Sequence, residues 1–371
     1  MEAQTLREHG LRIGALEAGP ANSIADVTGI AVGHVTVVRD EPDPPDGRGV
    51  ARSGVTAVVP GPVERIWAEP MQAGVAVLNG AGELTGSFEI AEWGWLASPV
   101  YLTATMSTGR VYDGAVAAAV ATDPRIGVEE VTIPVVGECD DSWLNDARVV
   151  QVEAEDVRRA LDAATTSFAQ GAVGAGTGMI CFDWKGGIGS SSRVTGEEHT
   201  VGVLVLANFG DVDQLRIDGV PVGRLLVDAG LGPPVDQYGP TTPWPGRRAA
   251  EGSCIAVVAT DAPLGAAQLA RVATRAGLGL ARTGSVGHNG SGEIFVAFST
   301  TSRSGRGEPP PAPGVANADL NPLFSATVDA TEEAVVNCLW AAETTTGRDN
   351  RTIERLPHEP VLELLAEHNR L

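Results

Sequence analysis

The sequence has one lysine, Lys185, among its 26 basic residues, so the remaining 25 (26 − 1) are arginines. Its four cysteines, Cys139, Cys181, Cys254 and Cys338, are far apart and show no Cys-x-x-Cys spacing. This pattern favours buried free thiols over a zinc site or a disulfide framework. No two histidines have the His-x-x-x-His spacing of metal ligands either. We therefore expect a protein without a bound metal.

Long apolar runs and an excess of positive charge are also missing. No stretch approaches the length of a membrane span, and the N-terminus carries Glu2, Arg7 and Glu8 in place of an apolar signal core. The formal charge is 26 − 47 = −21, and the acidic residues are spread along the chain rather than gathered in a tail. This charge disfavours nucleic acid and anionic membranes as partners. The sequence therefore predicts a cytoplasmic protein that binds neither.

Two further kinds of motif are incomplete. The glycine-rich stretches 174–178 and 277–279 do not complete the Gly-x-Gly-x-x-Gly fingerprint, so no dinucleotide cofactor is expected. Asn289 stands where a Gly-x-Ser-x-Gly elbow would need its first glycine, which argues against a serine-histidine-aspartate triad at Ser291. Three histidines are therefore expected to be structural or surface residues: His34, His199 and His288.

The patterning that is present predicts layered α and β structure. The chain has 371 residues, 43% hydrophobic and 20% charged, as in globular proteins with a sizeable core. Short apolar runs flanked by turn residues predict buried strands at 55–59, 75–78, 201–207, 255–259 and 294–298. Helical spacing predicts helices at 112–122, 155–170, 264–280 and 331–343. Thr331, followed by two glutamates, is expected to cap the last helix. Because these elements do not alternate strictly, a layered arrangement is favoured over a doubly wound sheet.

The junction between Gly252 and Ser253 has the features of a self-cleavage point. Small and polar residues at 247–251 lead into it, and Ser253 stands at the threshold of the strand predicted at 255–259. If Ser253 attacks the Gly252 carbonyl, an N-to-O acyl shift and hydrolysis release a new chain that begins with Ser253. Glycine suits this position because it lets a side chain approach its carbonyl and tolerates strained dihedrals. The Gly-Ser pair alone is no signal, because it occurs at four other places.

Motifs along nearly the whole chain supply the missing context. They read, in order, NSIADV (22–27), GH (33–34), NGAGELTG (79–86), WLND (143–146), FDWKGGIG (182–189), ANFG (207–210), VVATDAPL (257–264), GLARTG (279–284) and NGSGEIF (289–295). Together they resemble the DmpA-type aminopeptidases, the P1-family L-aminopeptidases/D-esterases and their β-peptidyl aminopeptidase relatives. The resemblance implies an αββα four-layer sandwich, one domain spanning 1–371 and formed by two self-processed chains, 1–252 and 253–371. It also implies a homo-oligomer, commonly a tetramer of processed protomers.

Three residues are candidates for the reaction itself. Ser291 and Glu293 are two residues apart at the start of a predicted strand, where the period of two places both side chains on one face. Glu293 would then hold Ser291 as a relay toward Ser253, and the serine-serine-glutamate constellation of the family matches these three positions. The α-amine that cleavage creates on Ser253, with an ordinary pKa near 8, is a second candidate for the base. The sequence leaves both open.

Four other residues complete the predicted site. The resemblance assigns Asn208, at the end of a predicted strand, to the stabilisation of the oxyanion. Glu138, with Asp140 beside it, is the candidate for binding the ammonium group of the substrate. Asp140 departs from the family, where a tyrosine is expected, and this change puts the substrate preference in doubt. Lys185 is a candidate for electrostatic support, because its ammonium could hold a nearby carboxylate or shift a neighbouring pKa.

The resemblance thus predicts a serine hydrolase that releases small N-terminal residues from peptides, amides or esters through an acyl-enzyme. A second reading is an acyltransferase or endo-amidase on the same scaffold, of the ornithine acetyltransferase or nylon-oligomer hydrolase type. Those enzymes typically carry threonine as the nucleophile, so Ser253 argues against them. A third reading is a structural protein that has lost catalysis, with Asp140 as the sign of that loss.

Overall fold

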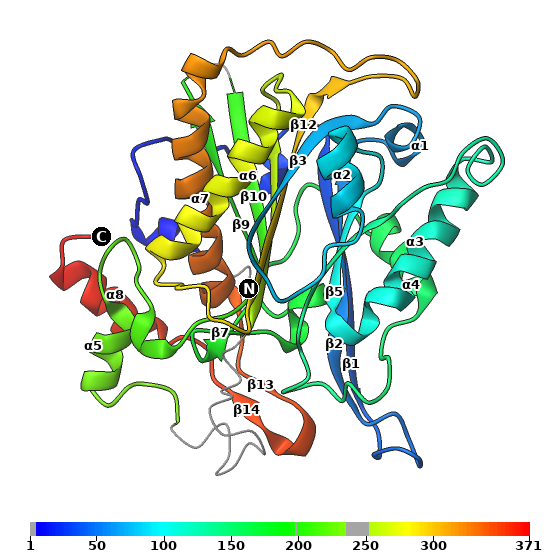
Figure 1. The fold of residues 1–371 in the computed structure, drawn as a ribbon. Helices are drawn as coiled ribbons and strands as arrows, with labels where there is room; N and C mark the ends of the chain where they lie inside the picture. The colour runs from blue at the N-terminus through cyan, green and yellow to red at the C-terminus, as the bar shows by residue number, and fades with distance from the viewer. Residues whose placement is uncertain (1–4, 197–198, 235–251) are drawn as a thin grey trace.

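The computed structural model describes residues 5–196, 199–234 and 252–371, and its main features are two β-sheets (Figure 1). The first has four strands in the order β1 (Ile30–Asp40), β2 (Val50–Pro60), β5 (Val100–Ala104) and β6 (Val135–Cys139). The second has six, in the order β4 (Trp95–Leu96), β3 (Met71–Gly80), β12 (Gly292–Arg303), β11 (Ser253–Thr260), β10 (His199–Asn208) and β9 (Gly187–Thr195). Two short hairpins are formed by β7 (Ile180–Cys181) with β8 (Trp184–Lys185) and by β13 (Thr345–Thr346) with β14 (Thr352–Ile353).

The helices form the outer layers. They are α1 (Val63–Ile66), α2 (Ser87–Trp93), α3 (Thr108–Thr122), α4 (Ala154–Asp162), α5 (Val222–Asp228), α6 (Ala266–Arg282), α7 (Asn321–Ala341) and α8 (His358–Glu367). Helices α6 and α7 cover the six-stranded sheet, and α3 and α4 cover the four-stranded sheet on the other side of the molecule (Figure 1). Across residues 5–196, 199–234 and 252–371, no helix has the length and apolar character needed to cross a membrane.

Strands β10, β11 and most of β12 are buried on both faces, and their alternate residues belong to two different cores. Leu204, Ile255 and Val296 face the four-stranded sheet and share one core with it. Their neighbours Val203 and Ala256 belong to a second core with α6 and α7. This use of both faces explains why the strands read as continuous apolar runs. The layers follow the order helices, sheet, sheet, helices, which confirms the predicted αββα sandwich.

All five predicted strands are present, within β2, β3, β10, β11 and β12, but two helix boundaries were predicted wrongly. Helix α4 ends at Asp162, because Thr165 exchanges two backbone hydrogen bonds with Val32 of β1 at 2.9 and 3.0 Å. Helix α7 begins at Asn321, with a proline in its first turn. Thr331 is therefore no cap, and its hydroxyl donates to the Thr327 carbonyl at 2.7 Å inside the helix.

The Gly252–Ser253 bond lies at the beginning of β11, an inner strand of the six-stranded sheet. Ser253 begins β11, which pairs antiparallel with β10 and parallel with β12. Strands from both sides of this bond therefore share one sheet and its two cores. The predicted chains 1–252 and 253–371 would each contribute strands to it, so neither would bury its apolar surface alone.

Candidate active site

Three strand ends position the candidate nucleophile. In the register of the sheet, Ser253 lies opposite Asn208 on β10 and Gly292 on β12. Neighbouring strands are about 4.8 Å apart, so these backbones are in direct contact. Ser253 is buried, and its hydroxyl lies near the thiol of Cys139 on β6, which donates to the Leu206 carbonyl. The Ser253 side chain therefore points into the space between the two sheets.

The Gly252 carbonyl, the target of the predicted self-cleavage, already accepts a hydrogen bond. Its donor is the backbone N–H of Gly292, at 3.2 Å. An N–H in this place is the kind of group that stabilises the negative oxygen of a tetrahedral intermediate. A Cβ atom on Gly252 would overlap the carbonyl oxygen of Asn208. Glycine is thus required here by the close approach of β10, a reason that the sequence did not reveal.

Ser291 and Glu293 form a buried pair at the start of β12. The Ser291 hydroxyl donates to the Glu293 carboxylate, and both side chains are buried. Burial raises the pKa of Glu293, and the hydrogen bond from Ser291 opposes this rise. Both residues also line a shallow recess, together with Phe209 and His288.

Successive side chains of a strand point to opposite faces of the sheet, and this alternation separates the Ser291–Glu293 pair from the Ser253 hydroxyl. Glu293 lies opposite Cys254, whose side chain faces the α6 and α7 core, whereas Ser253 shares the other face with Ile255. A proton relay that links Ser253 to Ser291 and Glu293 must therefore pass around the ends of the strands. Ser291 is placed for this path, because it directly precedes Gly292, the register partner of Ser253.

The side-chain amide of Asn208 is held at both ends. Its Oδ1 atom accepts from the backbone N–H of Ile180 at 2.8 Å, and its Nδ2 atom donates to the Asp140 carbonyl at 3.0 Å. Nδ2 also lies 3.1 Å from the position that a Cβ on Gly252 would take. An amide nitrogen carries two hydrogens, so Nδ2 keeps a second N–H for an acceptor near Gly252.

Replacing Asn208 by alanine should therefore slow both self-cleavage and substrate turnover. Losing one oxyanion donor typically costs about 10²- to 10³-fold in rate. Asn337→Ala is a matched control, since Asn337 is also buried and donates to a strand carbonyl, that of Ser190. Stopped time courses of processing and steady-state kinetics would measure both effects. Wild-type rates in Asn208→Ala would show that Asn208 does not stabilise the oxyanion.

Glu138 is a buried carboxylate near the same strand ends. It accepts from the backbone N–H of Glu83 at 2.8 Å and from the hydroxyl of Thr105. Its Oε1 atom and the Gly292 Cα atom both lie beside Gly82, at 3.1 and 3.5 Å from the position of an added Cβ. Burial raises the pKa of Glu138, the hydrogen bonds from Thr105 and the Glu83 N–H oppose this rise, and the negative charges of Asp140 and Glu83 add to it. An ammonium group placed here would offset these effects.

Asp140 and Lys185 interact chiefly with the backbone. The Asp140 carboxylate is exposed and accepts from the N–H of Ser142 at 2.8 Å, while its carbonyl is the one that holds Asn208. Lys185 is buried and donates to the carbonyls of Gly176, Met179 and Gly186 at 3.1, 2.7 and 2.9 Å. Burial lowers its pKa to about 7. The carboxylate partner expected for Lys185 is thus replaced by three carbonyls.

The cysteines and histidines lie as follows. All four cysteines are buried free thiols, as predicted. His34 is on β1 in the other sheet, where burial lowers its pKa to about 4. His199 lies 3.9 Å from Asp261, and His288 lies 3.2 Å from Gln214. In the parts of the chain that the structure describes, no three His, Cys, Asp or Glu side chains gather as metal ligands would.

Three contributors to the site escaped the sequence analysis. The N–H of Gly292 is a backbone group, and only its place in the motif around Ser291 pointed to it. Thr105 follows β5 and holds Glu138, and no local pattern marks it. Cys139 follows Glu138 directly, and its contact with Ser253 depends on the stacking of the two sheets.

Comparisons with known proteins identify the family of this chain. The family model described as "Peptidase family S58" matches residues 22–353. The chain belongs to peptidase family S58. The solved structure of the L-aminopeptidase D-Ala-esterase/amidase of Ochrobactrum anthropi, described as a variant of the Ntn hydrolase fold, superimposes with a TM-score of 0.87 at 37% identity over 99% of both chains. The predictions of DmpA-type membership and of a hydrolase of the aminopeptidase class are confirmed.

Two β-peptide enzymes are among the similar proteins. The β-peptidyl aminopeptidase BapA of Sphingosinicella microcystinivorans is 41% identical over 360 residues, which cover 95% of this chain and 90% of BapA. A β-aminopeptidase of a Burkholderia species superimposes with a TM-score of 0.83 at 39% identity over 99% of both chains. Similarity of this extent places the same framework of strands and helices in all these proteins.

Proposed function

We propose that this chain is a self-processing aminopeptidase whose nucleophile is Ser253. The observation that carries the proposal is the setting of the Gly252–Ser253 bond at the start of β11. There the Gly252 carbonyl accepts from Gly292, and Gly252 packs against Asn208 with no room for a side chain. A target carbonyl with a donor in place, next to a buried hydroxyl, supports cleavage at this bond into chains 1–252 and 253–371.

The proposed maturation has two steps. The Ser253 Oγ atom attacks the Gly252 carbonyl carbon, its proton passes to the Ser253 nitrogen, and the amide becomes an ester. Water then hydrolyses the ester, which leaves a carboxylate on Gly252, the free Ser253 hydroxyl and a new α-amine on Ser253. The precursor is in this sense a zymogen.

The mature enzyme would use the same hydroxyl on its substrate. Ser253 attacks the acyl carbon, the leaving amine or alcohol takes a proton, and water releases the acyl group from the ester. Asn208 and the Gly292 N–H stabilise the oxyanion. The base that accepts the Ser253 proton is the Ser291–Glu293 pair or the α-amine of Ser253. Since the chemistry uses only these groups, no metal or other cofactor takes part in the proposal.

Glu138 is proposed to bind the free ammonium group of the substrate. Its buried carboxylate is held by Thr105 and Glu83 with no basic side chain among those contacts, so an ammonium would supply the missing positive charge. Family relatives named for β-peptidyl, L-aminopeptidase and D-Ala-esterase activities suggest small N-terminal residues in peptides, amides or esters.

Glu138→Gln should raise the KM for aminoacyl p-nitroanilides by about 10- to 100-fold, because a charged hydrogen bond contributes about 1.5–3 kcal/mol. Substrates of the same shape without the amino group should be cleaved as slowly by the variant as by the wild type. Michaelis profiles with both substrates give the comparison. Equal losses with the two would exclude ammonium binding at Glu138.

A substrate panel tests the proposed activity as a whole. Aminoacyl p-nitroanilides of L-α, D-α and β configuration should release p-nitroaniline, whereas an acetylated donor offered with an amino-acid acceptor should not transfer its acetyl group. Transfer without hydrolysis would favour the acyltransferase reading. A processed protein that cleaves no member of the panel would favour the structural reading. Homo-oligomeric assembly and a cytoplasmic location stay predictions of the sequence.

A further inference from the structure

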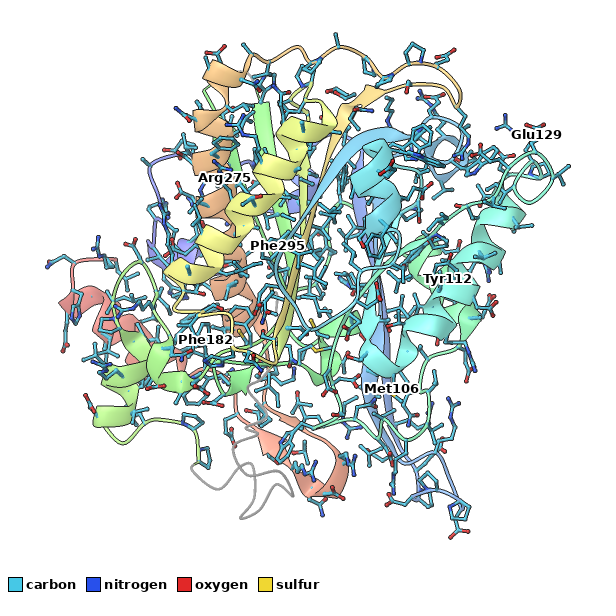
Figure 2. All side chains as sticks on the ribbon, viewed as in Figure 1. Met106, Tyr112, Glu129, Phe182, Arg275 and Phe295 are labelled. Atoms are coloured by element: carbon cyan, nitrogen blue, oxygen red, sulfur yellow. The ribbon has the colours of Figure 1, made fainter. Side chains whose placement is uncertain are left out.

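The β7–β8 hairpin has an unusual turn. Its two turn residues, Phe182 and Asp183, have φ values of +50° and +63°. Two-residue turns of this kind favour Asn-Gly or Gly-Gly, since a bulky residue at positive φ is strained. Phe182 is nevertheless buried, with its ring edge-on to that of Phe209 at 5.2 Å, close to the lower end of the sheet in Figure 2. Strain of this kind persists where the surroundings fix the conformation.

The β7–β8 hairpin is hydrogen-bonded to the end of β10 and to the segment that follows it. The Ile180 N–H donates to Asn208 Oδ1 at 2.8 Å, and the Phe182 N–H donates to the Phe209 carbonyl at 2.7 Å. The Asp183 carboxylate accepts from the N–H of Val212 at 2.8 Å. Three successive contacts therefore fix Asn208 and the chain beyond it against the hairpin.

Lys185 fixes the hairpin from the other side. Its Nζ atom donates to the Met179 carbonyl at 2.7 Å, and this carbonyl belongs to the same peptide group as the Ile180 N–H. Donation to three carbonyls uses all three hydrogens of a protonated amine, so in this arrangement the peptide has the Lys185 ammonium at its oxygen and the Asn208 oxygen at its hydrogen. Because hydrogen bonds in series polarise one another, the ammonium strengthens the bond to Asn208. The other two carbonyls that Lys185 holds, of Gly176 and Gly186, flank the same segment.

The Ile180 N–H determines which end of the Asn208 amide faces the scissile bond. With Oδ1 on Ile180, the Nδ2 donor is turned toward Asp140 and Gly252. A flipped amide would place its N–H₂ against the Ile180 N–H and its oxygen against the Asp140 carbonyl, and both contacts would be repulsive.

We propose that Lys185 is a positioning residue for the Asn208 amide, acting through the Met179–Ile180 peptide so that the amide donor is aimed at the reacting carbonyl. This rests on the proposed function, in which Asn208 stabilises the oxyanion. Lys185 touches no substrate and acts only through Asn208.

A double-mutant cycle of Lys185→Met and Asn208→Ala tests the proposal in the full chain. Alone, Lys185→Met should lower kcat and the rate of self-cleavage by about 10-fold, less than the 10²- to 10³-fold expected for loss of the donor itself. KM should stay within about twofold, because an oxyanion donor acts in the transition state. In the Asn208→Ala background, Lys185→Met should cost less than about threefold more. Lys185→Arg keeps the cation and should lose less kcat than Lys185→Met. Lys185→Gln, which also lacks the charge, replaces Lys185→Met in the cycle with the same expected results if the latter does not fold.

Arg193→Met provides the matched control. Arg193 is also a fully buried basic residue that donates to backbone carbonyls, here of Ser192 and Ile13, although it pairs with Glu333 as well. It lies on β9 away from the end that carries Asn208. Arg193→Met should lower the melting temperature of the protein without a selective loss in kcat. A Lys185 effect that is undiminished without Asn208, or that appears in KM, would overturn the proposal. Wild-type rates in Asn208→Ala would instead refute the role of Asn208 itself.

Discussion

Ser253→Ala is expected to leave a single uncut polypeptide with no aminopeptidase activity. The substitution removes the hydroxyl that lies at the start of β11, between Asn208 and Gly292, and that is proposed to attack the Gly252 carbonyl. Loss of a serine nucleophile lowers kcat by about 10⁴-fold or more, since the remaining groups bind and polarise without attacking. Denaturing electrophoresis and p-nitroanilide hydrolysis would measure the two effects.

Two variants separate the chemistry from the fold in this experiment. Ser253→Cys keeps a nucleophile of similar size and should retain measurable processing. Ser299→Ala removes a buried serine at the other end of β12, whose hydroxyl donates to the Ala262 carbonyl at 2.7 Å, and should be cut normally. Cleavage of Ser253→Ala at the same bond would assign the nucleophile elsewhere.

Glu293→Gln is expected to have the second largest effect, a loss in kcat of about 10²- to 10⁴-fold, the range of general-base contributions. Glutamine keeps the size and the hydrogen bond of the side chain but removes the charge that draws the Ser291 proton. The pKa of Glu293 is raised by burial, so the wild-type carboxylate is neutralised at a higher pH than an ordinary glutamate. Activity should therefore fall on the acid side as Glu293 gains a proton, and this limb should vanish in the variant.

Glu332→Gln is the control for Glu293→Gln. Glu332 is also buried, with its pKa raised by burial to about 7, but it lies on α7 next to Arg282. Glu332→Gln should hydrolyse substrate at the wild-type rate, and its activity should still fall at acid pH as in the wild type. If Glu293→Gln behaves in the same way, the relay is excluded and the α-amine of Ser253 becomes the base. Separate measurements of self-cleavage and of substrate hydrolysis show in which of these reactions the Ser291–Glu293 pair acts.

The strands were predictable because their apolar residues serve two cores at once. Residues 201–207 and 255–259 are buried on both faces, and such runs are apparent in the sequence. The helix boundaries depended on partners far away in the chain. Helix α4 stops where Thr165 pairs with Val32, and α7, which packs against β9, β10 and α6, extends back to Asn321. Local spacing carries no information about these contacts.

The site was predictable from resemblance to known relatives, whereas its supporting contacts were not. The pattern of Ser291 and Glu293 indicated their hydrogen bond, since residues two apart on a strand share a face. No pattern indicated that a Cβ at Gly252 would strike the Asn208 carbonyl, or that Lys185 would hold the peptide behind Asn208. These contacts arise where β7, β10 and β11 meet, and the segments are separate in the sequence.

Intact-mass measurement of the purified wild-type protein is the most direct test of self-cleavage at the Gly252–Ser253 bond. We expect two polypeptides that split between Gly252 and Ser253, with masses that sum to the full chain plus one water. The smaller should begin at Ser253, and its appearance should coincide with the onset of p-nitroanilide hydrolysis. A single uncut chain with full activity would contradict the account.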